Sequence, residues 1–104
     1  MAIVDLSASA SYPVIKVISS VGTTQQEVTL PAGKLRVTAG SSAAIYLATS
    51  SVSDGAAMPA DKVSIPGDQL LELDLSYSSG DKVSSIAVAA QGGTADIQII
   101  LERA

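Results

Sequence analysis

The chain has 104 residues and contains no cysteine and no histidine. We therefore expect one domain without disulfides, without Cys- or His-based metal sites and without the commonest general base of enzymes. The formal net charge is −4, and the six Lys and Arg residues stand singly along the sequence. Nucleic-acid binding favours a basic stripe with aromatic residues among the cations, so no nucleic-acid partner is expected.

Hydrophobic side chains make up 47% of the residues, although phenylalanine and tryptophan are absent. The core is therefore expected to consist of Val, Ile, Leu and Ala. The mean hydropathy of +0.40 is high for a small chain, yet no run approaches the roughly 18 apolar residues of a membrane-spanning helix. We expect no membrane partner, and we expect the apolar surplus to be buried against other protein subunits.

The first twelve residues are rich in Ser and Ala and carry apolar side chains at Ile3, Val4 and Leu6, with Tyr12 at the end. They predict either a flexible lead or an arm that lies across a neighbouring subunit. The opening residues lack the basic region and long apolar core of a secretory signal, so synthesis in a cytoplasm is expected. The folded domain is predicted to span residues 13–104.

Period-two alternation of apolar and polar residues recurs along the rest of the chain, separated by segments rich in Gly, Pro and Ser. It predicts strands at residues 13–18, 27–30, 34–39, 44–48, 63–65, 71–75, 83–90 and 95–101. The first strand is apolar on both faces apart from Lys16. No segment keeps helical spacing. The pattern predicts an all-β fold, a single β-sandwich or jelly-roll-like domain of about eight antiparallel strands.

The last two predicted strands flank Gly92-Gly93, a pair typical of a tight β-hairpin turn. Folding about this pair would place Ala90 opposite Ala95, Val88 opposite Ile97 and Ile86 opposite Ile99. A second hairpin is predicted between residues 34–39 and 44–48, with Val37 facing Ile45 and Leu35 facing Leu47 if the connection is a three-residue loop.

Besides the first twelve residues, two further regions are candidates for contact with a partner. The long irregular segment 49–61 ends in small residues and one Met, and its candidates are Ala56, Ala57, Met58 and Pro59. Tyr46 is expected on the outer side of its strand, beside Arg36. It would cover its own strand, dock on a protein partner or stack on a sugar, and the first two are favoured.

Catalytic and metal-binding patterns are weak. Glu72 and Asp74 fall on one strand face and could form a carboxylate pair, but they are better explained as the solvent-facing row of that strand. The turn aspartates Asp54, Asp61, Asp68 and Asp81 form no dense calcium loop. We therefore expect no catalytic residues, no cofactor and no metal ligands.

The chain as a whole resembles small virion proteins of tailed bacteriophages. The segments that carry the likeness are Leu30-Pro31-Ala32-Gly33, Ala44-Ile45-Tyr46-Leu47-Ala48-Thr49, Ile65-Pro66-Gly67-Asp68 and Ala89-Ala90-Gln91-Gly92-Gly93-Thr94-Ala95-Asp96-Ile97. The resemblance implies a capsid decoration, or cement, protein in the virion. Its subunits, often trimers, would bind the major capsid protein and one another. No family site residues are carried over.

Three classes of function stay open at this stage. A cement protein would use the apolar points of residues 1–12 and the segment 56–59 as contacts. A tail-fibre or adaptor domain would bind a receptor or glycan through Tyr46. An enzyme, the least favoured class, would depend on Glu72 and Asp74.

Overall fold

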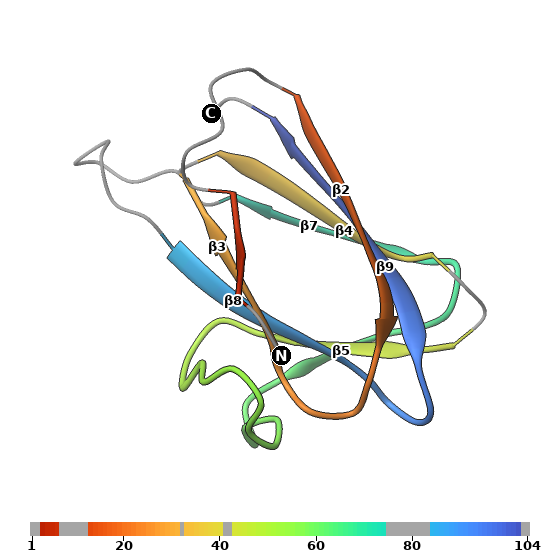
Figure 1. Ribbon diagram of the computed structural model, residues 1–104. Helices are drawn as coiled ribbons and strands as arrows, with labels where there is room; N and C mark the ends of the chain where they lie inside the picture. The colour runs from red at the N-terminus through yellow and green to blue at the C-terminus, as the bar shows by residue number, and fades with distance from the viewer. Residues whose placement is uncertain (1–2, 7–12, 32, 41–42, 75–83, 103–104) are drawn as a thin grey trace.

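The computed structural model describes residues 3–6, 13–31, 33–40, 43–74 and 84–102 (Figure 1). Throughout these ranges the chain is all-β and contains no helix, so none of it forms a helix that could cross a membrane. The strands are β1 (Val4–Asp5), β2 (Val14–Val21), β3 (Gln26–Leu30), β4 (Lys34–Ala39), β5 (Ile45–Ala48), β6 (Val63–Ile65), β7 (Leu70–Asp74), β8 (Ser84–Ala90) and β9 (Ala95–Glu102).

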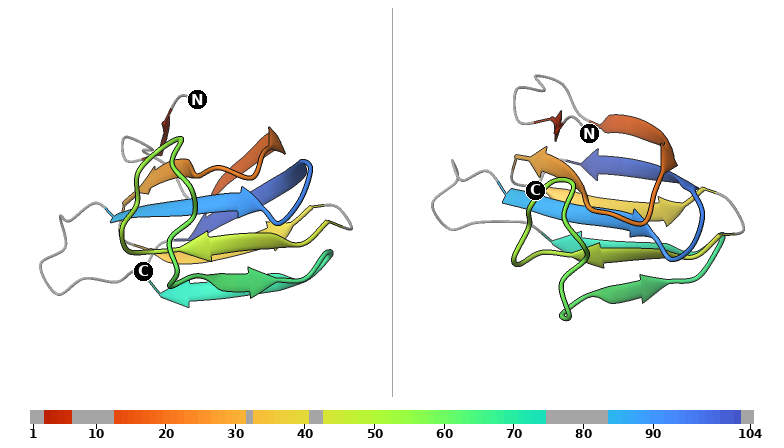
Figure 2. Two further views of the ribbon diagram at one scale, coloured as in Figure 1. Left: turned by 90° about the horizontal axis from the view of Figure 1, so that it is seen from below. Right: turned by 60° about the horizontal axis from the view of Figure 1, so that its bottom comes forward.

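The strands form two sheets that face each other (Figure 2). The first, called sheet A here, has the order β1-β3-β8-β5-β6, and the second, sheet B, has the order β2-β9-β4-β7. The predicted all-β sandwich is confirmed. The described residues hold nine strands, and the short β1, which the sequence did not indicate, runs parallel to β3.

Strands far apart in the sequence pair in a nested order. β5 pairs with β6, β4 with β7, β3 with β8 and β2 with β9, all antiparallel. The chain is thus a long antiparallel ribbon that turns back between β5 and β6 and is then rolled up. The further pairs β5 with β8 and β4 with β9 join the rolled ribbon into two sheets. This arrangement is compatible with a jelly roll.

One aliphatic layer fills the space between the sheets. Each strand contributes alternate side chains to it, as the pattern in β9 shows, where Ile97, Ile99 and Leu101 are fully buried. The buried hydrophobic residues among those described are all Val, Ile, Leu or Ala, as the composition predicts. The alternation of apolar and polar residues predicts which side chains enter the core, because successive side chains of a strand point to opposite faces of its sheet.

The predicted hairpin about Gly92-Gly93 is wrong. β8 pairs with β3 and β5 in sheet A, whereas β9 pairs with β2 and β4 in sheet B. Alternation fixes which side chains face the core, and it is satisfied equally well when two consecutive strands face each other across the core. Residues 91–94 therefore form an arch between the sheets, in which Gly93 adopts a φ of 63°.

The predicted pairing of residues 34–39 with 44–48 fails for the same reason, because β4 lies in sheet B and β5 in sheet A. Arg36 and Tyr46 consequently lie in different sheets and are not neighbours. Arg36 forms ion pairs on sheet B with Glu72, at 3.2 Å, and with Glu102, at 3.0 Å.

The link between β3 and β4 brings backbone unusually close to β9. Gly33 is buried, and a Cβ at this position would lie 2.5 Å from the carbonyl oxygen of Glu102. Because that oxygen belongs to the backbone of a central strand, it has little freedom to move away.

We expect Gly33→Ala to lower the free energy of unfolding by about 1–3 kcal/mol, the cost of overpacking a tight contact. Denaturant titration measures this. The matched control is Gly92→Ala, because a Cβ there meets nothing within 4 Å, and it should change stability by less than about 0.5 kcal/mol. Equal effects of the two substitutions would contradict the close approach.

Candidate interaction surface

The segment between β5 and β6, residues 49–62, crosses the outer face of sheet A (Figure 2). It leaves the end of β5, passes over β8 and reaches the start of β3, where backbone hydrogen bonds hold it. Underneath lie three outward-facing alanines, Ala48, Ala87 and Ala89, each at most 2% exposed. Small side chains at these positions allow the segment to lie directly on the sheet.

Gln25 holds this segment in place and is 1% exposed. Its side-chain oxygen accepts a hydrogen bond from the N–H of Ser53 at 2.8 Å, and its side-chain nitrogen donates to the carbonyl of Ala57 at 2.9 Å. Its backbone N–H donates to Ala56, and its carbonyl accepts from Gly55. Both polar ends of the buried amide are satisfied, so the segment has a fixed conformation.

A second contact reinforces the first. One carboxylate oxygen of Asp54 accepts a hydrogen bond from the backbone N–H of Glu27 at 2.9 Å. Asp54 is one of the turn aspartates considered for calcium. Its carboxylate therefore binds the backbone of β3.

The four candidate contact residues of this segment lie next to one another on the surface. Ala56 and Ala57 are exposed, and Met58 and Pro59 are half-buried. Residues 56–59 form a largely apolar surface, called the loop surface here. Gln25 holds its backbone through hydrogen bonds to Ala56 and Ala57. The surface is prearranged, so little conformational entropy would be lost when a partner binds.

Tyr46 lies on the outer face of sheet A in β5 and is half-buried. The ammonium group of Lys62 sits 5.0 Å from the centre of its ring and also donates a hydrogen bond to the carbonyl of Pro59 at 3.3 Å. The cation lies over the ring at a distance typical of a cation–π contact. Lys62 thus connects Tyr46 with Pro59 of the loop surface.

The apolar residues near the N-terminus differ in their exposure to solvent. Val4, in β1, and Leu6 are half-buried and pack against the protein's own core, and the N–H of Leu6 donates to Thr29 at 2.8 Å. Ile3 is 52% exposed and is available to a partner. Tyr12 lies outside the described residues.

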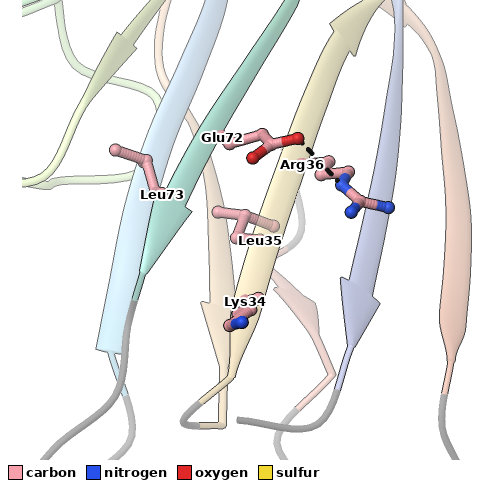
Figure 3. Close-up of a pocket in the computed structure, with 5 residues that line it drawn as sticks. All are labelled: Lys34, Leu35, Arg36, Glu72 and Leu73. Carbon is pink, nitrogen blue, oxygen red and sulfur yellow. Dashed lines mark hydrogen bonds and ion pairs between the residues drawn. The ribbon is translucent and has the colours of Figure 1, made fainter.

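The acidic positions of β7 lie opposite basic positions of β4. Glu72 points toward Arg36 at the rim of a shallow hollow that Lys34, Leu35 and Leu73 also line (Figure 3). Asp74 occupies the backbone position opposite Lys34. Each acidic position is thus matched by a basic one across the strands, as expected for a solvent-facing row.

The described residues contain no group of three or more acidic side chains that could hold a metal ion. Asp54 bonds the backbone of β3, Asp68 adopts a turn conformation with a φ of 61°, and Asp61 is exposed. Asp81 lies outside the described residues.

Sequence reasoning missed Gln25, which it placed in a polar loop. A Gln-Gln pair after a Ser- and Thr-rich stretch gives no sign that its side chains are buried. The three alanines under the segment offer a weak signal, because outward positions of a strand are seldom occupied by Ala when they face water.

Comparison with models of known protein families, with curated proteins and with solved structures finds no match to this chain.

We expect Gln25→Ala to lower the free energy of unfolding by about 1–3 kcal/mol, because it leaves the Ser53 N–H and the Ala57 carbonyl without partners. Hydrogen exchange of the amides of residues 53–57 should accelerate more than that of β4 or β9. Gln98→Ala is the matched control, since Gln98 is exposed on sheet B, and it should cost less than about 0.5 kcal/mol. Unchanged exchange in residues 53–57 would refute the role of Gln25.

Proposed function

We propose that the protein is a structural virion subunit, a capsid decoration or cement protein of a tailed bacteriophage. It is made in the host cytoplasm, binds the major capsid protein and copies of itself, and stabilises the head through protein–protein contacts. The proposal gives it no catalytic step and no cofactor.

The observation that carries the proposal is the loop surface on sheet A. Residues 56–59 form a low apolar surface held by a buried amide. A rigid surface of this kind suits contact with another protein, whereas a small-molecule site is usually a concave pocket with convergent polar groups.

The charges of the described residues also favour a structural role. Arg36 is neutralised by Glu72 and Glu102, and Lys62 lies over Tyr46. Such pairs connect neighbouring strands and leave the charged groups occupied with one another. They support a stable framework better than they support proton transfer.

Receptor or glycan binding is the alternative, and it depends on the ring of Tyr46. The ammonium of Lys62 on one face of that ring makes stacking of a sugar less favourable. We therefore favour the virion role.

The test uses empty, expanded shells assembled from the major capsid protein encoded in the same genome. The wild-type protein should co-sediment with the shells, and Ala56→Asp should weaken binding at least about tenfold, because it buries an unpaired carboxylate in the contact. Ala56 is exposed, so the substitution should leave the fold intact.

Gln98→Asp is the control, since it adds a carboxylate at an exposed position on the opposite sheet, and it should bind like the wild type. Wild-type protein that stays in the supernatant would contradict the proposal, as would a genome that encodes no capsid protein.

A further inference from the structure

The exposed large aliphatic side chains are confined to the rims of the sandwich. Among the described residues they number five, Ile3 at 52%, Ile15 at 68%, Val17 at 50%, Val63 at 42% and Leu70 at 49%. Ile3 directly precedes β1, and the others lie in β2, β6 and β7. These four strands are the edge strands of the two sheets. The apolar surplus of the sequence is therefore displayed at sheet edges.

The two rims lie on opposite sides of the molecule (Figure 2). The β1/β2 rim carries Ile3, Ile15 and Val17. The β6/β7 rim carries Val63 and Leu70, and it is hollowed at two places. Ile65 and Leu71 line one hollow, and Val63, Leu73 and Asp61 line the other. One rim thus projects apolar side chains, and the other offers apolar hollows.

We propose that these rims bind each other between copies of this chain, the β1/β2 rim of one copy against the β6/β7 rim of the next. The inference rests on the proposed function, in which the protein binds copies of itself. It identifies the surfaces through which the copies bind. The contact is heterologous, so each copy uses both rims.

Strand direction supports the head-to-tail contact. Neighbours in sheet B are antiparallel throughout, so its two edge strands, β2 and β7, run in opposite directions. A second copy in the same orientation would place its β2 beside β7 and continue the antiparallel order. The lengths also agree, because β7 has 5 residues and β2 keeps an unbroken register from Val14 to Ile18, before its bulge.

Charge selects this contact over a symmetric one. Lys16 is the only charged residue of β2, and neither its side chain nor that of Asp61 forms an ion pair or hydrogen bond with another described residue. Pairing β2 with a second β2, Ile15 against Val17, would place Lys16 opposite Lys16, which is unfavourable. In the heterologous contact Lys16 approaches the hollow that Asp61 lines.

The faces of the strands agree with that placement. Lys16 is opposite Ile99 in β9, so it lies on the inner side of sheet B, the side on which Leu71 and Leu73 lie in β7. Ile15 and Val17 lie on the outer side, as Leu70 does. Lys62, the other cation at the hollow, is engaged with Pro59 and the ring of Tyr46.

The experiment measures self-association of the purified full chain by sedimentation velocity and native mass spectrometry. The wild type should form an oligomer. Lys16→Asp and Asp61→Lys should each weaken association at least about tenfold, because each places like charges at the contact. The double variant Lys16→Asp with Asp61→Lys should restore association to within about threefold of the wild type, since it reverses the pair.

Gln98→Asp is the matched control, because it adds a carboxylate at an exposed position on a central strand of the same sheet, and it should associate like the wild type. Ile15→Ser, at a largely exposed position, should weaken association without unfolding the protein. Circular dichroism confirms that each variant is folded.

A monomeric wild type would overturn the inference, and so would an oligomer that Lys16→Asp leaves unchanged or a double variant that fails to associate. Shell binding is measured separately. A monomer that binds shells would overturn only the inference, and an oligomer that binds none would overturn only the proposed function.

Discussion

The whole structure depends on tight packing of one layer of aliphatic side chains between the two sheets. With no phenylalanine or tryptophan available, Val, Ile, Leu and Ala must fill this space at the density of a protein interior. The backbone approaches closely where it can, as at Gly33 beside Glu102. On the outer side of sheet A, alanines let residues 49–62 lie directly on the strands. The segment therefore acts as a partial third layer, and the prearranged loop surface is a product of the same packing.

The sequence predicted strand positions well and strand partners poorly. The bounds of β4 and β6 agree with the periodicity, because polar and apolar side chains alternate there between solvent and core. The partners of β8 and β9 were wrong, because alternation is the same for two strands that pair side by side and for two that face each other across a core. The difference is carried by the arch at residues 91–94, and a Gly-Gly pair suits a tight turn and an arch alike.

The candidate surface was predictable only in part. Residues 56–59 were found from their small side chains and their Met, but the residue that holds them, Gln25, gives no local signal because its burial depends on a segment some 30 residues away. Lys16 stood out in the sequence as a single charge in an apolar strand. The proposed contact of Lys16 could be inferred only from the topology, in which β2 and β7 are the two edge strands of sheet B. Asp61 lines a hollow beside β7.

The nested strand order also affects when this protein can fold. β9 lies between β2 and β4, so the last of the described strands sits inside sheet B rather than at its edge. Until it emerges from the ribosome, β2 lacks its neighbouring strand in sheet B. Folding must then be late and cooperative, since distant segments have to meet before either is stable. A nascent chain that stops before β9 retains open sheet edges and is a target for chaperones and proteases.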